Sequence, residues 1–171
     1  QGEQRHGGGA VFQRSSARAK GVDPEQWIAE ARNRYDAEIA HNDRSIGALL
    51  EKLEQLGILD NTLVVVVSDH GEEFLEHGWT THGHSLYQEQ THSVLLFHHP
   101  RLLPAPLRID EPAQLVDVMP TILDLLEIPA AGIIQGQSLA SLMLAAGMRG
   151  QPFERKLAVM SSRLAETNVP P

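Results

Sequence analysis

The chain has 171 residues, of which 42% are hydrophobic, so it is long enough for one domain with a hydrophobic core. Its 22 acidic and 14 basic residues give a formal net charge of -8, which argues against a nucleic acid or an anionic membrane surface as the main partner. The sequence has no cysteine, so disulfides and thiolate chemistry are excluded and any metal must be bound by carboxylate and imidazole groups.

Residues 1–22 predict an irregular or disordered lead-in. The segment has three consecutive glycines and several arginines but no apolar period, and it does not begin with methionine, which suggests a truncated start. No apolar run in the sequence is long enough to span a membrane, and no charged-then-apolar leader opens it. The compartment is therefore left open.

Residues 24–56 predict a long helix with at most one break, because apolar residues recur there at spacings of three, four and seven. Asp23 is expected to cap it and Gly57 to end it. The run 62–67 is too uniformly apolar for a half-exposed strand, and it predicts an interior parallel strand buried on both faces. Helix, turn and buried strand together indicate an α/β fold.

Three further elements follow. A strand is expected at 93–97, ending before a pair of histidines that we expect to be structural or exposed. A helix is expected at 114–126, with Pro120 near its boundary or kinking it, and a shorter helix at 138–146.

Asp69 and His70 directly follow the apolar strand and precede Gly71, which lets the backbone bend sharply. Open α/β sheets bind ligands beyond the carboxyl ends of their strands, and a carboxylate beside an imidazole suits a divalent cation. The equally weighted alternative is a strand-end turn in which Asp69 caps the following segment.

The next residues are rich in acids and histidines, namely Glu72, Glu73, Glu76, His77, His82 and His84. Such crowding is costly unless a cation or substrate organises it, although each glutamate taken singly fits a solvated surface or supporting position as well as a ligand position. His82, between Thr81 and Gly83, is placed to contact a substrate oxyanion or protonate a leaving group, and His84 shares this setting. An ordinary loop histidine is the simpler alternative for each.

The segment Ser68–Gly78, with the sequence SDHGEEFLEHG, resembles the metal-binding signature of the sulfatase family within the alkaline phosphatase superfamily. The segment 82–89, HGHSLYQE, resembles the part that follows it in many members. Stretches upstream at 35–47 and downstream at 117–139 agree in order and approximate spacing. The resemblance extends from about residue 23 to residue 142.

This resemblance implies part of an alkaline-phosphatase-like sandwich, with a mostly parallel central sheet flanked by helices. It implies hydrolysis of a small-molecule or carbohydrate sulfate ester at a divalent metal, most often calcium and in some relatives manganese, magnesium or zinc. Asp69 and His70 match two metal-ligand positions, and His70 in place of asparagine favours a transition metal and relatives that cleave phosphodiesters or phosphonates. His82, or alternatively His84, lies near the family position that contacts the ester oxygens.

The family nucleophile, a formylglycine made within a Cys/Ser-x-Pro-x-Arg motif, has no counterpart in this sequence, and no strand ending in paired acids precedes Asp23. We therefore expect a partial catalytic domain at 23–147, truncated at its N-terminal side, and a weakly ordered segment at 148–171. Two ligands are too few for a full site, so we expect weak or absent metal binding and no turnover by the chain alone. Uncovered sheet edges also predict self-association.

Three functional hypotheses follow from the sequence. The first is part of a sulfatase. The second is part of a phosphodiesterase or phosphoethanolamine transferase of the same superfamily. The identity of the missing nucleophile would distinguish this hypothesis from the first. The third is a noncatalytic remnant that persists as a metal-binding module.

Overall fold

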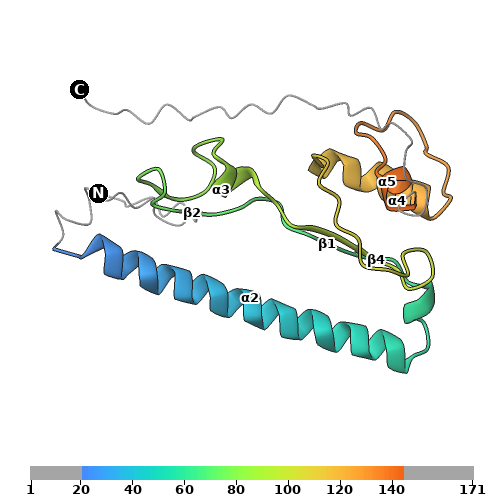
Figure 1. Ribbon diagram of the computed structural model, residues 1–171, viewed down its shortest axis with the longest axis horizontal. Coiled ribbons are helices and arrows are strands. Elements are labelled where there is room, and N and C mark those ends of the chain that lie inside the picture. Colours follow the sequence, from blue (N-terminus) through green and yellow to red (C-terminus); the bar gives the residue numbers. More distant parts are fainter. Residues whose placement is uncertain (1–20, 145–171) are drawn as a thin grey trace, which may run out of the picture. The chain divides into compact units, whose positions relative to one another are not determined.

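The computed structural model describes residues 21–144, and residues 1–20 and 145–171 lie outside it (Figure 1). The described residues form two compact units, 21–51 with 67–94 and 52–66 with 95–144. Helices and strands are mixed along the chain, consistent with an α/β fold. The elements are α2 (Pro24–Gln55), β1 (Val64–Val67), β2 (Glu73–Phe74), β3 (Thr80–Thr81), α3 (Gln88–Thr91), β4 (Leu95–His98), α4 (Val118–Leu125) and α5 (Ala140–Leu144), with 3-10 turns at Leu59–Asn61 and Leu115–Asp117.

The long helix predicted from the apolar periodicity is α2, which is unbroken. The backbone N–H of Glu25 donates to Oδ1 of Asp23 at 3.1 Å, so the expected cap is present. At the other end Gly57 adopts a φ of 68°, the left-handed conformation that stops a helix. None of the helices in residues 21–144 is sufficiently long and apolar to cross a membrane.

The two strands predicted around the polar segment are shorter than expected and pair with each other as β1 and β4. The residue after β1, Ser68, donates its backbone N–H to the carbonyl of Val94, the residue before β4, at 3.1 Å. The two strands therefore run in opposite directions, and this pair does not supply the parallel part of the expected sheet.

The expectation that the apolar strand is buried on both faces is wrong for the described residues. Val64, Val65 and Val66 are partly buried and Val67 is exposed. Burial on both faces requires elements packed over both faces of a strand, whereas β4, the one strand paired with β1 within residues 21–144, lies beside its edge.

The predicted helix at 114–126 begins as a 3-10 turn and continues as α4. Pro120 lies in the first turn of α4, where a missing N–H is tolerated, as the sequence suggested. Asp117, between turn and helix, is fully buried. Its Oδ1 accepts the backbone N–H of Gln137 and its Oδ2 that of Gln114, both at 2.8 Å. This carboxylate fixes the chain before α5 against the start of α4.

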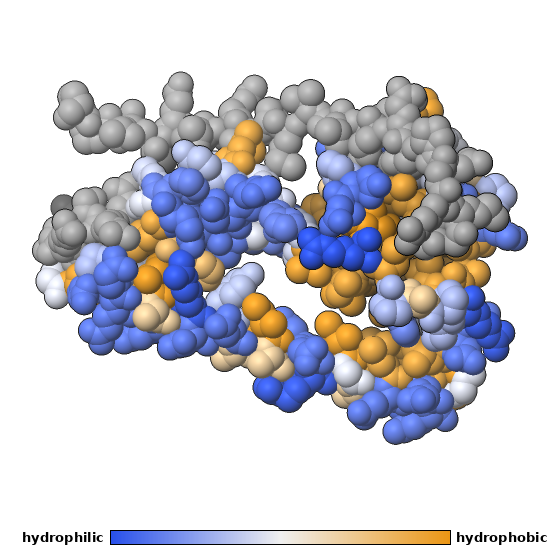
Figure 2. Space-filling view, in the orientation of Figure 1, coloured by the Kyte–Doolittle hydropathy of each residue, from blue (hydrophilic) through white to orange (hydrophobic). Residues whose placement is uncertain are grey.

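The surface differs between the two units (Figure 2). Large apolar side chains are exposed around β4 and α4, including those of Leu96, Met119 and Ile133. The segment between β1 and β4 is mainly hydrophilic in the same view. The polar chemistry predicted from the sequence is thus concentrated in one unit.

Candidate metal and substrate site

The segment between β1 and β4 forms a loop that is closed at its base. Besides the backbone contact described above, the N–H of Val94 donates to the hydroxyl oxygen of Ser68 at 2.8 Å. Further along, the N–H of Gly71 donates to the carbonyl of Gln90 at 2.9 Å. A Cβ at Gly71 would overlap the carbonyl oxygen of Glu89, so glycine is required for the two sides of the loop to approach this closely.

Three side chains of this loop converge at the end of β1. His70, Glu72 and His82 each offer one ligand atom, and these atoms lie within 4.8 Å of one another. The rings of His70 and His82 are stacked, with centroids 3.6 Å apart. Nδ1 of His82 lies 3.1 Å from Oε2 of Glu72. The sequence placed His70 and His82 in the site separately, and the structure brings them together.

Asp69, the other predicted metal ligand, does not join this group. Its side chain is 87% exposed, and its Oδ1 accepts the backbone N–H of His70 at 3.1 Å. The same oxygen lies 3.6 Å from Nε2 of His70. Asp69 is therefore close to His70, although it is not part of the group that His70 forms with Glu72 and His82.

Glu73 lies beneath the site and is only 1% exposed. Its Oε1 accepts the backbone N–H groups of His77 and Trp79 at 3.0 and 3.2 Å. Its Oε2 accepts the side-chain amide of Gln90 at 2.8 Å and lies 3.3 Å from Nε2 of His84. The hypothesis that Glu73 is a solvated loop acid is therefore wrong.

The pKa of Glu73 reflects two opposing effects. Burial raises it, but the hydrogen bonds that the carboxylate accepts, first among them the one from Gln90, lower it more. The net pKa lies below the ordinary value for glutamate. The carboxylate is therefore a permanent anion that holds the loop between β2 and α3 in shape.

His84 is packed against this network and is separate from the cluster of His70, Glu72 and His82. Its Nε2 lies 2.8 Å from the side-chain nitrogen of Gln90 as well as near Glu73. Its Nδ1 is buried and has no hydrogen-bond partner among the described residues. A buried ring nitrogen without a partner is energetically costly, so it marks a position where the polar network of the loop is incomplete.

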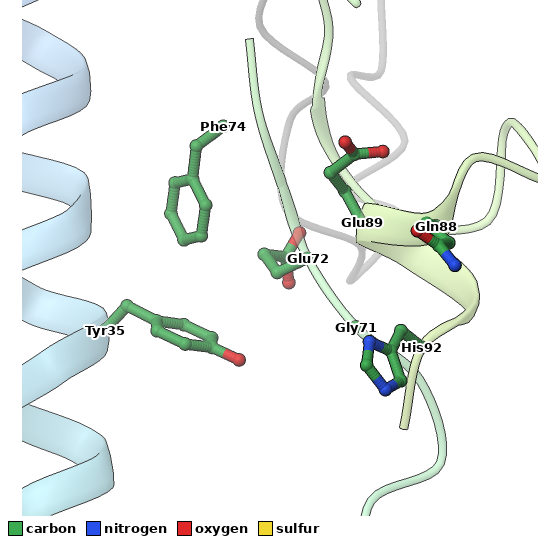
Figure 3. Close-up of a pocket in the computed structure, with 7 residues that line it drawn as sticks. All are labelled: Tyr35, Gly71, Glu72, Phe74, Gln88, Glu89 and His92. Atoms are coloured by element: carbon green, nitrogen blue, oxygen red, sulfur yellow. The ribbon is translucent and has the colours of Figure 1, made fainter. Parts of the chain in front are cut away.

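A cavity of about 370 Å³ adjoins the cluster (Figure 3). Tyr35 of α2 and Phe74 of β2 lie on one side of it, and their rings meet edge to face with centroids 5.3 Å apart. Gly71, Glu72, Gln88, Glu89 and His92 complete the lining. Glu72 borders both the cavity and the histidine pair, so a ligand in the cavity would reach the cluster through this residue.

Two contacts support the outer part of the loop. Arg32 of α2 forms an ion pair with Glu76 at 2.7 Å. Burial raises the pKa of Glu76, but its hydrogen bonds and Arg32 lower it more, so the net pKa lies below the ordinary value. The His77 ring stacks on Tyr87 with centroids 3.4 Å apart, and its Nε2 lies 3.2 Å from Glu89. The loop is thus ordered by contacts that involve no ligand.

The sequence did not single out Glu72 as part of the cluster or Gln90 as part of the buried network. Glu72 could have been found, because residues two apart in an extended segment face the same side and Glu72 follows His70 by two. Gln90 carries no comparable signal, since its role depends on a contact with Glu73, 17 residues earlier. The two histidines at the end of β4 are structural or exposed, as expected: His98, the last residue of the strand, is exposed, and His99, which follows it, is buried.

Comparisons with known proteins place these features in context. The model of the family described as Sulfatase matches residues 3–128. Arylsulfatase K of Bos taurus is 36% identical over 115 residues, which are 67% of this chain and 21% of that protein. N-acetylglucosamine-6-O-sulfatase of Bacteroides thetaiotaomicron is 35% identical over 109 residues, 64% of this chain and 19% of that protein. The chain spans about one fifth of the length of these relatives.

Two solved structures are similar to the described fold. One is a protein in complex with its substrate D-glucosamine-2-N,6-O-disulfate, with a TM-score of 0.54 and 36% identity over 59% of this chain and 20% of the other. The second is a phosphonate monoester hydrolase from Silicibacter pomeroyi, with a TM-score of 0.53 and 30% identity over 64% of this chain and 21% of the other. Both support the α/β fold expected from the sequence.

Proposed function

Because the chain belongs to the sulfatase family, we propose that it supplies the metal-binding and ester-contacting part of a sulfate-ester hydrolase. The observation that carries this proposal is the convergence of His70, Glu72 and His82 in a closed loop at the end of β1. The named substrate of a similar structure, a sulfated glucosamine, favours a carbohydrate sulfate as the ester.

In this proposal Asp69 and His70 bind a divalent cation. The donors fit such an ion, since two imidazoles and the carboxylate of Glu72 lie within reach of one another and Oδ1 of Asp69 lies 3.6 Å from Nε2 of His70. Oε1 of Glu72 is in addition a buried acceptor without a partner among residues 21–144. When bound, the cation would neutralise the charge on the sulfate oxygens. Calcium is the family expectation, and the imidazole donors also admit manganese, magnesium or zinc.

His82 and His84 are proposed to contact the ester. His82 is the more exposed of the two histidines. Its Nδ1 lies 3.1 Å from Oε2 of Glu72, and a carboxylate at this distance can accept a hydrogen bond from a protonated imidazole. His82 is therefore suited to protonating the leaving group. His84 is held from below by Glu73 and Gln90 and presents its other ring nitrogen. The nucleophile is not assigned to any residue of this chain, and without one we expect no turnover by the chain alone.

The test compares the 171-residue chain with the protein expressed from the same reading frame extended upstream. The extended protein is expected to hydrolyse p-nitrophenyl sulfate in the presence of a divalent cation, whereas the chain alone is expected to be inactive. His82→Ala should lower kcat more than it raises KM, because proton transfer acts in the transition state. An extended protein that carries the nucleophile motif, binds the cation and yet leaves every sulfate ester intact would refute the proposal.

A second candidate, hydrolysis of a phosphodiester or phosphonate monoester, has one observation in its favour. The position after Asp69 is a histidine, and the chain is similar to a phosphonate monoester hydrolase. Comparing kcat/KM for p-nitrophenyl sulfate and p-nitrophenyl phenylphosphonate separates the two. A noncatalytic metal-binding role is favoured instead if the upstream sequence holds neither a nucleophile motif nor paired acids.

The division into a lead-in at 1–22, a catalytic part at 23–147 and a C-terminal segment at 148–171 is likewise proposed, and most of both ends lies outside the described residues. Self-association through uncovered strands is supported by the exposure of Val67, Val94 and Leu96. Sedimentation velocity across a concentration series tests it, and a constant monomer would refute it.

A further inference from the structure

We propose that the cavity between α2 and α3 is a sugar subsite that accepts an uncharged sugar ring and excludes a ring with a second anionic group. The inference rests on the proposed function in taking a carbohydrate sulfate as the substrate. It goes beyond that function by naming the substrate that the cavity selects and the residue that selects it, Glu89 of α3.

The first support is the aromatic wall of the cavity, formed by Tyr35 of α2 and Phe74 of β2 (Figure 3). Tyr35 is 42% exposed. Arg32 already lies over Phe74, with its guanidinium carbon 5.8 Å from the ring centroid. The face of an aromatic ring is electron-rich and attracts the C–H groups on the apolar face of a sugar. Tyr35 is therefore the ring on which a sugar can stack.

The second support is the hydrogen-bonding character of the remaining lining. The side chains of Glu72 and Glu89 are 23% and 33% exposed, so a ligand in the cavity can reach both carboxylates. An ionised carboxylate can only accept hydrogen bonds, so the ligand must donate them. The hydroxyl groups of a sugar donate, whereas an ionised sulfate group has only acceptor oxygens. The amide of Gln88 can both donate and accept, which suits a ligand with several hydroxyl groups.

The third support is the charge of the lining. The described residues that line the cavity include two glutamates and no lysine or arginine. Arg32 is engaged elsewhere, since it pairs with Glu76 at 2.7 Å. A cation at the histidine cluster would mainly offset Glu72, which belongs to that cluster. Glu89, whose Oε2 lies 3.2 Å from Nε2 of His77, would remain to repel a second anion.

Glu72 joins the cavity to the histidine that we propose to contact the ester. It lines the cavity, and its Oε2 lies 3.1 Å from Nδ1 of His82. The volume of about 370 Å³ is near the lower end of the range for small-molecule sites, so it suits one sugar ring better than a longer saccharide. The selection therefore acts on the ring that carries the ester.

The kinetic test uses two methyl glycosides of glucosamine 6-sulfate that differ only at the amine, one N-acetylated and one N-sulfated. With the protein extended upstream, kcat/KM should be at least about tenfold higher for the N-acetyl ester at low salt, and added salt should reduce this preference by screening. Glu89→Gln should remove most of the preference by lowering KM for the N-sulfated ester, with kcat unchanged because Glu89 does not touch the ester.

The matched control is Glu51→Gln, which alters an exposed acid of the same helix as Tyr35. Glu51 is 16 residues further along α2, about 24 Å away at the helical rise per residue, and its replacement should leave the preference unchanged.

Binding without catalysis is measured on the 171-residue chain by saturation-transfer NMR with methyl β-N-acetylglucosaminide and its N-sulfated counterpart, neither of which carries the 6-sulfate ester. We expect saturation transfer to the uncharged glycoside only, and its loss in Tyr35→Ala. Circular dichroism establishes that the variant is folded, and Tyr35→Leu replaces it if it is not.

The inference is overturned if the folded chain transfers no saturation to the uncharged glycoside or transfers it equally to both. It is also overturned if the extended protein hydrolyses both esters equally well, or if Glu89→Gln leaves the preference intact. Selective binding of the uncharged glycoside by the chain, combined with an extended protein that hydrolyses no ester, would refute the proposed function and leave the sugar subsite standing.

Discussion

Each of the two compact units contains a fully buried carboxylate, but the two acids differ in their partners. Asp117 accepts a backbone N–H at each oxygen, from Gln114 and Gln137. Glu73 accepts backbone N–H groups at one oxygen only, and its other oxygen faces the side chains of Gln90 and His84. A backbone amide can only donate, whereas a histidine can change its protonation state and a glutamine can turn.

This difference in partners corresponds to two roles, one purely structural and one that also positions a side chain of the candidate site. The carboxylate of Asp117 holds two chain segments together through the backbone N–H groups of Gln114 and Gln137. The carboxylate of Glu73 fixes the loop in the same manner but also holds a histidine that we propose to contact the ester. Both units therefore contain a buried acid. What distinguishes Glu73 is that the side chains of His84 and Gln90 lie against one of its oxygens.

The largest expected effect comes from glycines that pack against backbone in each unit. A Cβ at Gly136 would overlap the carbonyl of Val116, and Gly136 also has a φ of 90°. Gly136→Ala should cost about 2–6 kcal/mol of unfolding free energy, from crowding and backbone strain together. Gly71→Ala lacks the positive φ and should cost about 1–3 kcal/mol. Urea denaturation measures both.

The matched control is Gly47→Ala in α2, where a Cβ would meet nothing within 4 Å. This variant should gain roughly 0.5–1 kcal/mol, because alanine loses less entropy in a helix. Equal stability for the variants at residues 47, 71 and 136 would show that the close approaches at Gly71 and Gly136 do not exist in solution.

The second prediction tests the two acids directly. Asp117→Asn should cost about 1–3 kcal/mol, because one backbone N–H must face an amide nitrogen that cannot accept. Glu73→Gln should cost less, since its new amide can be turned toward His84, whose Nε2 can accept a hydrogen bond. Thermal unfolding monitored by circular dichroism ranks the variants. The comparison drawn above fails if Glu73→Gln is the more destabilising change.

The smallest expected effect is the pH dependence carried by Glu76. Burial raises the pKa of this carboxyl, but its hydrogen bonds and Arg32 lower it more, so the pKa in the folded state is below the ordinary value. The resulting stabilisation is complete above the ordinary pKa and is lost as the pH falls through the lower, folded-state pKa. Glu76→Gln should therefore flatten the acid limb of stability measured with a chelator present. An unchanged acid limb would show that ionisation of Glu76 contributes nothing to the stability of the folded chain.

Elements whose causes are local were predictable from the sequence. The cap at Asp23, the stop at Gly57 and the position of Pro120 depend on residues within one or two turns, and the structure has them where expected. The burial of Glu73 was not predictable, because its partners His84 and Gln90 are 11 and 17 residues away. The burial of β1 was overestimated, since apolar composition does not specify how many neighbours a strand has.

The sequence predicted that a metal site follows β1, but it did not predict which side chains come together there. Adjacent residues in an extended segment point to opposite sides, so Asp69 and His70 did not have to face the same ligand. In the structure the side chain of Asp69 is exposed, and the side chain of His70 lies close to those of Glu72 and His82. Such a group cannot be identified from the sequence without knowing how the loop folds. The loop's fold depends on contacts between residues far apart in the chain, such as the one between Ser68 and Val94.

That closure also bears on how the shape of the cavity can change. Because Ser68 and Val94 fix both ends of the loop, residues inserted near its tip add only to the length of a ring that is already closed. Ring-closure entropy grows slowly with length, and doubling the loop would cost only about 0.6 kcal/mol. Insertions beyond β3 would therefore reshape the cavity wall while Ser68 and Val94 keep the base of the loop in place, at little cost in stability.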